Sequence, residues 1–296
     1  MRALAEYIMR GRLQAIAVAS LLTMVSMLLP LFAYVLSGVP IALISLRRGG
    51  RIGMQVILGT LAVVALFSWP AGIDPMIAPA FAVSIWLPVW LCAGLLRLTE
   101  SQGVVVLAAG AMGALFVVFM HLMVNDVTAW WKAWFDAWIQ HQMPADSVAQ
   151  YKQLLASAMP LMNAMMAAGL VVGIIVTLML ARSWQSALYN PGGFRQEFYR
   201  LRLPRWLGVV TLAVTALALV RTGLDQGMFR DLVVVLVFLY LFQGVACVHR
   251  WVAGRGMSSG WLLGMYVLLL IMPQLILFVA CVGMADSWLV GQKPLR

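Results

Sequence analysis

The chain alternates long apolar runs with short polar segments. A helix rises 1.5 Å per residue and a bilayer's hydrocarbon core is about 30 Å thick, so about 20 apolar residues form one span. The pattern predicts an all-α fold, a polytopic transmembrane helical bundle. The runs free of Asp, Glu, Lys and Arg are 13–46, 52–73, 75–96, 101–125, 153–181, 206–220, 232–249 and 256–285.

The first run, 13–46, is too long for a single span, because a helix of that length would extend about 51 Å. Pro30 lies at its middle, where a proline breaks a helix. We therefore interpret 13–46 as a hairpin of two short helices, which gives about nine spans in total. The count falls to eight if the hairpin is re-entrant.

The charge distribution supports the hairpin, because Lys and Arg in short loops favour the cytoplasmic face. With the hairpin, 14 of the 20 basic residues lie inside, against 11 if 13–46 is one kinked span. The predicted protein is a multi-pass protein of the bacterial inner membrane with a cytoplasmic N-terminus and an external C-terminus. In this map Arg250 lies inside, whereas Asp231 and Asp286 lie outside.

Composition excludes a soluble fold and narrows the function. The chain is 64% hydrophobic and 10% charged, against about 45–50% and about 25% in soluble proteins. The net charge of +10 is dispersed between the apolar runs, which argues against nucleic-acid binding and leaves the lipid bilayer as the expected partner. Neither a metal-ligand spacing nor a catalytic motif is present, so we expect no catalytic residues, no metal, no cofactor and no enzyme activity.

Two extramembrane segments are candidate interaction surfaces. In the external insertion 125–157, tryptophans recur at i, i+4 and i+8, which predicts an amphipathic helix at headgroup depth. In the cytoplasmic loop 183–204, a Pro-Gly-Gly turn precedes a short amphipathic helix on the inner leaflet. The candidate interaction residues are Trp130, Trp131, Trp134, Trp138, Asn190, Gly192, Gly193, Phe194 and Arg195.

Polar side chains within the apolar runs are candidate ligand-binding residues, because such groups tend to face the interior of a membrane bundle. Interhelical hydrogen bonding explains them equally well. At the outer end of 101–125, His121 and Asn125 lie one turn apart, either as a polar binding site or as an ordinary helix terminus. Arg230 and Asp231 are interpreted as an interfacial cap. The candidate ligand-binding residues are Gln55, Asn163, Tyr240, Gln243 and Gln274.

Several short motifs resemble the YybS-like family of polytopic bacterial membrane proteins. That family is distantly similar to the substrate-binding S components of energy-coupling-factor transporters. The motifs are Pro30-Leu31, Val39-Pro40-Ile41-Ala42-Leu43, Arg47-Arg48-Gly49-Gly50-Arg51-Ile52-Gly53, Asn190-Pro191-Gly192-Gly193-Phe194-Arg195 and Leu201-Arg202-Leu203-Pro204.

The resemblance implies an architecture and a type of partner. It implies one membrane domain over 1–296, with an S-component-like six-helix bundle over 13–182 and three additional spans over 205–285. It also implies a membrane or ATPase partner protein, contacted through small residues of the first helix such as Ala15 and Ala19. The first functional hypothesis is therefore binding or transport of a small organic solute. The alternative is an interaction or scaffold protein in cell-envelope assembly.

Overall fold

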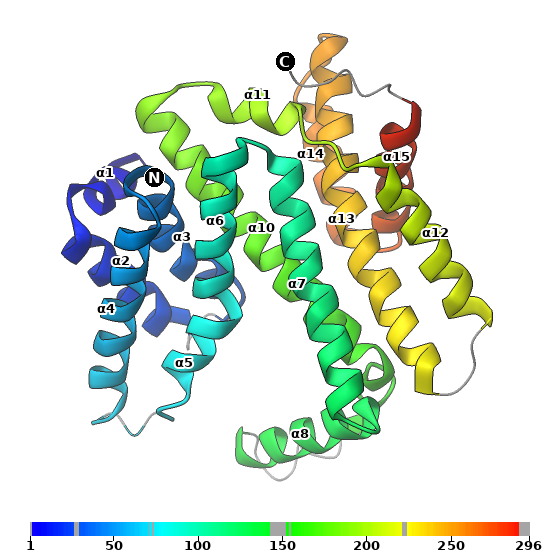
Figure 1. The fold of residues 1–296 in the computed structure, drawn as a ribbon, viewed down its shortest axis with the longest axis horizontal. Coiled ribbons are helices and arrows are strands. Elements are labelled where there is room, and N and C mark those ends of the chain that lie inside the picture. The colour runs from blue at the N-terminus through cyan, green and yellow to red at the C-terminus, as the bar shows by residue number, and fades with distance from the viewer. Residues whose placement is uncertain are drawn as a thin grey trace.

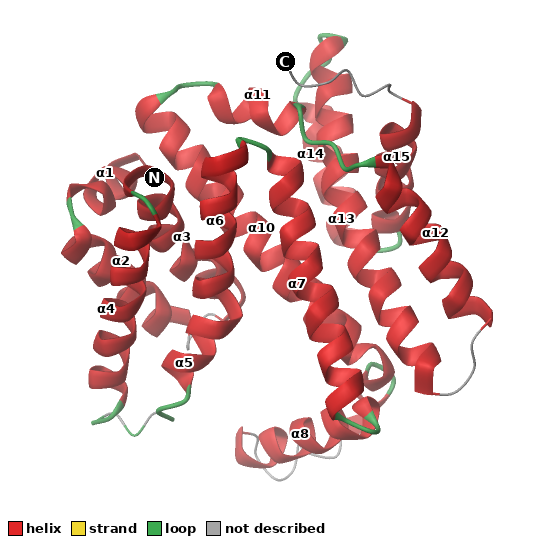
Figure 2. Cartoon of the chain, viewed as in Figure 1, coloured by secondary structure: helices red, strands yellow, loops and turns green. Residues whose placement is uncertain are grey.

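The computed structural model describes residues 2–26, 30–70, 72, 74–142, 152–153, 155–220 and 224–289, and every regular element in these ranges is a helix (Figure 2). The predicted all-α fold is confirmed. Five helical segments in the described ranges are long and apolar enough to cross a membrane: 50–68, 77–99, 102–123, 159–189 and 227–254. The elements are α1 Arg2–Arg10, α2 Arg12–Ser26, α3 Pro30–Arg48, α4 Gly50–Ser68, α5 Ile77–Phe81, the π-helix η1 Ala82–Trp86, α6 Leu87–Thr99, α7 Gln102–Met123, α8 Val127–Gln142, the 3₁₀-helix η2 Met159–Leu161, α10 Met162–Tyr189, α11 Gly193–Tyr199, α12 Arg205–Val220, α13 Leu224–Gly254, α14 Gly260–Ile271 and α15 Leu275–Leu289.

The run 13–46 forms two separate helices that pack against each other, as predicted. The second helix, α3, begins at Pro30. At its other end, Arg48 donates to the carbonyl oxygens of Met9 at 2.6 Å and Arg10 at 3.3 Å. The end of α3 therefore returns to the start of α2, which is the geometry of a hairpin. Residues 27–29 lie outside the described ranges.

The long helices define two ends of the molecule, which we name the α8 end and the α11 end after the short helix lying across each (Figure 1). Basic side chains from different helices make contacts within the chain at the α11 end. The Arg47 guanidinium lies 4.5 Å from the centre of the Tyr189 ring, and Arg97 donates to the Ser45 carbonyl oxygen at 3.2 Å. This gathering matches the charge asymmetry that the sequence showed.

The last apolar run, 256–285, is not one span. It breaks at residues 272–274 into α14 and α15, because Pro273 cannot donate the backbone hydrogen bond that would continue the helix. The Arg250 guanidinium donates to Asp286 Oδ2 at 2.6 Å. The prediction that Arg250 and Asp286 lie on opposite faces of the membrane is therefore wrong, and α15 finishes at the α11 end.

The surface that the resemblance assigned to a partner protein is not available. Ala15 and Ala19 are both fully buried, in the region where α2 packs against α3 and α4. The prediction that these two residues face a partner is wrong, because the small side chains serve close packing within the chain itself.

Candidate functional site

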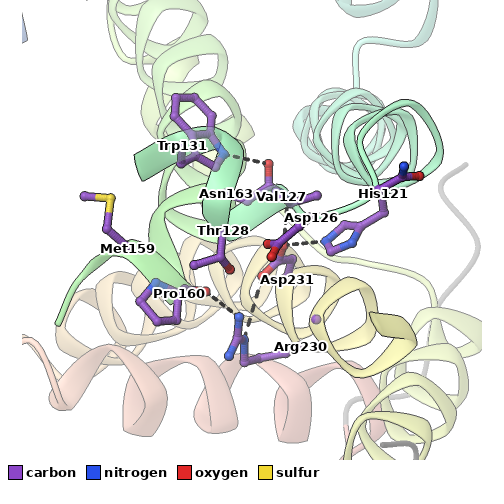
Figure 3. Close-up of a pocket in the computed structure, with 12 residues that line it drawn as sticks. His121, Asp126, Val127, Thr128, Trp131, Met159, Pro160, Asn163, Arg230 and Asp231 are labelled. Atoms are coloured by element: carbon purple, nitrogen blue, oxygen red, sulfur yellow. Dashed lines mark hydrogen bonds and ion pairs between the residues drawn. The ribbon is translucent and has the colours of Figure 1, made fainter. Parts of the chain in front are cut away.

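A polar cavity of about 220 Å³ lies at the α8 end, where α7, α8, α10 and α13 meet (Figure 3). The C-terminal end of α7, the N-terminal parts of α10 and α13, and the Trp-rich helix α8 form its wall. The cavity is lined by His121, Asn125, Asp126, Val127, Thr128, Trp131, Met159, Pro160, Asn163, Gly227, Arg230 and Asp231.

Asp231 is the central group of this cavity. Its side chain is only 2% exposed, and its Oδ2 atom lies 3.0 Å from His121 Nε2. The same oxygen accepts a hydrogen bond from Asn163 Nδ2 at 2.7 Å. Burying a carboxylate costs free energy unless hydrogen-bond donors compensate for the lost water. The contacts with His121 and Asn163 therefore offset the cost of burying Asp231. Gly227 permits the contact, since a Cβ there would lie 3.1 Å from His121 Cε1.

The hydrogen-bonded chain continues into α8. Trp131 Nε1 donates to Asn163 Oδ1 at 3.3 Å, and the Trp131 side chain is buried. Asn163 thus receives from the indole and donates to the carboxylate, which fixes the orientation of its amide. The chain Trp131–Asn163–Asp231–His121 ties together four helices that are distant in the sequence.

The second carboxylate oxygen of Asp231 is in a different situation. Among the described residues, Oδ1 is buried and has no hydrogen-bond partner. Arg230 Nε lies 3.9 Å from it in a long ion pair, while Arg230 Nη2 donates to the Pro160 carbonyl oxygen. Buried polar atoms usually have a hydrogen-bond partner, so a carboxylate oxygen that accepts no hydrogen bond beside a cavity is a place where a ligand can donate.

The cavity also carries an excess of acidic groups. Asp126 and Asp231 are both in its lining, against the guanidinium of Arg230 and the imidazole of His121, which is cationic only when protonated. Asp126 is partly used within the fold, because its Oδ1 accepts from the Ala129 backbone N–H at 2.9 Å and caps the start of α8. The acceptor that remains at Asp231 Oδ1 favours a ligand that donates hydrogen bonds.

The prediction that Arg230 and Asp231 form an interfacial helix cap is wrong. The helix α13 begins at Leu224, about two turns before Asp231, so the carboxylate lies within the helix rather than at its start. The run without charged residues begins only at residue 232, so the predicted helix was shorter than α13. The first turns of α13 contain Asp225, Arg230 and Asp231 and were interpreted as a loop.

The five candidate ligand-binding residues lie in separate places. Asn163 alone lines the cavity. Gln55 accepts from Arg12 at 2.8 Å, and Gln243 accepts from the Leu203 backbone N–H at 3.0 Å while donating to Asp286 at 3.0 Å. Tyr240 is buried in the main hydrophobic core, and Gln274 is exposed at the break between α14 and α15. The structure does not bring these five residues together.

The candidate interaction residues divide into two groups. On α8, Trp130, Trp134 and Trp138 are each more than 40% exposed, whereas Trp131 points into the cavity. These positions confirm the amphipathic helix that the i, i+4, i+8 spacing predicted, although residues 143–151 of the insertion lie outside the described ranges.

The turn before α11 is internally bonded. Ser186 Oγ donates to the Asn190 carbonyl oxygen at 2.6 Å and accepts from the Phe194 N–H at 3.0 Å. Gly192 has a φ of 85°, a left-handed conformation that favours glycine, and Gly193 is buried beside the Asn190 side chain. Phe194 stacks on Phe198, which in turn contacts His249 of α13. Among the candidate residues of this turn, Asn190, Gly192 and Arg195 are exposed.

Taken together, the apolar helices and the polar cavity at their ends define a helical membrane protein. The chain belongs to the family of predicted membrane proteins described as DUF2232, whose model matches residues 17–287. Comparison with curated proteins gives no match, and comparison with solved structures gives none either.

Proposed function

We propose that this membrane protein binds, and helps to move, a small organic solute carrying a protonated amine, and that the α8-end cavity is its binding site. The observation that carries the proposal is the buried Asp231 Oδ1, which has no hydrogen-bond partner among the described residues. An ionised carboxylate only accepts hydrogen bonds, and an ammonium group offers up to three N–H donors, so the two are complementary.

The volume of the cavity limits the size of the solute. A water molecule takes up about 30 Å³ in the liquid, so a cavity of about 220 Å³ holds roughly seven groups of that size. Pockets for drug-sized ligands are larger, at about 300–1,000 Å³. The cavity therefore suits a compact amine or the polar head of a larger molecule.

The proposal places the α11 end in the cytoplasm and the cavity on the outer side of a bacterial inner membrane, in accordance with the positive-inside rule. It also gives the S-component-like architecture a defined role. His121, Trp131 and Asn163 come from the segment 13–182, whereas Arg230 and Asp231 come from the additional segment 205–285. In this proposal the added helices complete the site, and any ATPase partner binds elsewhere than at Ala15 and Ala19.

The direct test is the thermal stability of the purified full chain with ethanolamine, compared with ethylene glycol as an uncharged control of similar size. A ligand that binds only the folded state stabilises it by about 1.4 kcal/mol at ten times its Kd. We expect ethanolamine to raise Tm and ethylene glycol to leave it unchanged.

The variant Asp231→Asn should abolish this response. Asp136→Asn is the matched control, because Asp136 lies on α8 but pairs with Lys152 at 3.3 Å outside the cavity lining. An equal response to ethanolamine in wild type and Asp231→Asn, or no response in wild type, would overturn the proposed function.

The exposed tryptophans of α8 support a second candidate, an interaction or scaffold protein in envelope assembly. Large aromatic side chains on the exposed face of a helix suit either the lipid headgroup region or a protein partner. Replacing Trp130, Trp134 and Trp138 with Ala leaves Trp131 and the cavity in place. Loss of a co-purifying protein in this triple variant would support the scaffold function, and an unchanged set of proteins would exclude it.

A further inference from the structure

An apolar groove lies between α7, α12 and α13, and on α13 its lining begins at Leu232, directly after the cavity residue Asp231. From its position we infer that the ligand is amphipathic, with an ammonium-bearing head in the α8-end cavity and one hydrocarbon chain in this groove. The inference rests on the proposed function and specifies the class of ligand. The groove has a volume of about 590 Å³ and is lined by aliphatic side chains, a glycine and one indole.

The cavity and the groove share two helices in a continuous order. On α7, Val118 lines the groove and His121, three residues later, lines the cavity. On α13, Asp231 lines the cavity and Val235, four residues later, lines the groove. Residues three or four apart lie on the same face of a helix. Each helix therefore has a polar position and an apolar position next to each other on one face. The contact of 3.0 Å between His121 and Asp231 joins the two helices at the level where their lining residues change from polar to apolar.

The dimensions of the groove suit one hydrocarbon chain. A methylene group is similar in size to a water molecule, which takes up about 30 Å³. The groove volume of about 590 Å³ therefore holds roughly twenty methylene groups. Along α7 its lining extends from Val104 to Val118, about 21 Å at the helical rise. That length exceeds the half-thickness of the hydrocarbon core, about 15 Å, so the chain would pass the bilayer midplane.

The charged groups of the cavity indicate which head the ligand carries. Asp231 offers an ammonium group a carboxylate oxygen that accepts no hydrogen bond among the described residues. Arg230 is 43% exposed on its side chain and can donate to a phosphate while keeping its contact with Pro160. A head with both an ammonium and a phosphate group, such as phosphoethanolamine, matches this pair of opposite charges. The inferred ligand is therefore an aminophospholipid or a lysolipid of that kind.

The test measures retention of lysophosphatidylethanolamine by the full chain in detergent, using native mass spectrometry. Lysophosphatidylglycerol is the matched probe, because it has the same chain and a phosphate but lacks the amine. We expect wild type to retain the amine lipid about fivefold more than the glycerol lipid, since only the amine can pair with Asp231.

The groove is tested by Ala114→Phe, which places an aromatic ring among its lining residues and leaves the cavity unaltered. Because contacts between a chain and helices within a membrane come from packing, we expect about fivefold less retention of lysophosphatidylethanolamine. Val210→Phe enters the same groove from α12 and should act in the same way. Ala62→Phe, on an exposed position of α4, is the control and should behave as wild type.

The outcomes separate the two proposals. If both groove variants retain the lipid as wild type does, the groove is not the chain site and the inference is overturned, while a preserved Tm shift with ethanolamine keeps the proposed function. If Asp231→Asn retains both lipids and still responds to ethanolamine as wild type does, both proposals fail. Each variant is first shown to be folded by its Tm without ligand. If one of the two groove variants is not folded, the other provides the test of the groove.

Discussion

Two buried carboxylates of this molecule have different surroundings, and the difference separates a structural group from a binding group. Asp286 Oδ2 accepts from Arg250 at 2.6 Å and from Gln243 at 3.0 Å, so this oxygen is bonded to a cation and to an amide. Asp231 Oδ2 is held by His121 and Asn163, but its Oδ1 atom has no hydrogen-bond partner among the described residues and makes only a long ion pair of 3.9 Å with Arg230 Nε. The first carboxylate locks α15 to α13, and the second is available to a ligand.

A matched pair of substitutions tests this difference. Asp286→Asn removes the negative charge opposite Arg250, whose side chain is only 21% exposed, and we expect the free energy of unfolding to fall by about 2 kcal/mol. Asp231→Asn keeps an oxygen that can accept from Asn163, so we expect a change below about 1 kcal/mol. Denaturant titration of both variants in one detergent measures the difference.

The control for the pair is Glu6→Gln, which removes the exposed ion pair between Arg2 and Glu6 and should leave the unfolding free energy unchanged. A larger loss in Asp231→Asn than in Asp286→Asn would contradict the assignment of roles.

The indole of Trp131 gives a second prediction at the scale of single residues. Trp131→Phe keeps an aromatic ring but removes the N–H that orients Asn163. We expect about fivefold weaker binding of ethanolamine, which corresponds to the loss of one ordinary hydrogen bond of about 1 kcal/mol. Trp134→Phe, on the exposed side of α8, should bind as wild type does, and equal affinities in the two variants would show that the indole does not support the site.

Sequence reasoning reached part of this site. Asn163 was a candidate because an amide in an apolar run is costly, and His121 beside Asn125 was interpreted either as a polar binding site or as an ordinary helix terminus. Their connection to Asp231 could not be predicted, because His121 and Asp231 are 110 residues apart and their contact depends on which helices pack side by side. The same limit applied to Gln243, whose partners come from the loop before α12 and from α15.

At the scale of helices, the crossing of α13 and α15 brings glycines of the described residues closest to the backbone of another helix. A Cβ on Gly244 would lie 2.0 Å from the Val279 carbonyl oxygen, and one on Gly283 would lie 2.2 Å from the Tyr240 carbonyl oxygen. Since both opposing atoms belong to the backbone, neither can move aside without separating the helices. Small residues at such crossings are typical of membrane bundles.

We therefore expect Gly244→Ala to destabilise the protein by about 2 kcal/mol or more, through separation of α15 from α13. The control is Gly264→Ala in α14, where a Cβ would meet nothing within 4 Å. In a helix Ala is normally up to about 1 kcal/mol more favourable than Gly, so this control should be neutral or stabilising. Thermal unfolding of both variants provides the comparison, and similar midpoints would contradict the close crossing.

The helices α14 and α15 also show where the hydrophobic pattern gave the wrong element. The run 256–285 has no charged residue, and its length alone suggested one long span. Pro273 was the available signal of a break, but run length cannot show whether a broken helix continues in the same direction or turns back. The ion pair between Arg250 and Asp286 decides this question, and that pair depends on tertiary packing.

At the scale of the whole molecule, the apolar runs predicted the fold class because membrane thickness imposes length and composition on each helix directly. The hairpin at Pro30 was predictable for the same reason. The side of the membrane on which α15 ends was not, because charge counting treated the final run as a full crossing. The structure places Trp288 near Arg205, whose guanidinium donates to the Trp288 carbonyl oxygen at 3.5 Å.

Cysteine labelling tests this topology. In a background where Cys92, Cys247 and Cys281 are replaced, we expect Leu289→Cys and Arg195→Cys to react with a membrane-impermeant maleimide from the same side of the membrane. Trp138→Cys, on α8, should react from the opposite side. If Leu289→Cys reacts together with Trp138→Cys, α15 ends at the other face and the arrangement of the last two helices is incorrect.

The central claim is that the cavity around Asp231 is a ligand site, and a side-chain-resolution structure of the full chain with saturating phosphoethanolamine tests it most directly. We expect density in the α8-end cavity, with the amine about 3 Å from Asp231 Oδ1 and the phosphate next to Arg230. An empty cavity, or density bound only at another part of the molecule, would contradict the account.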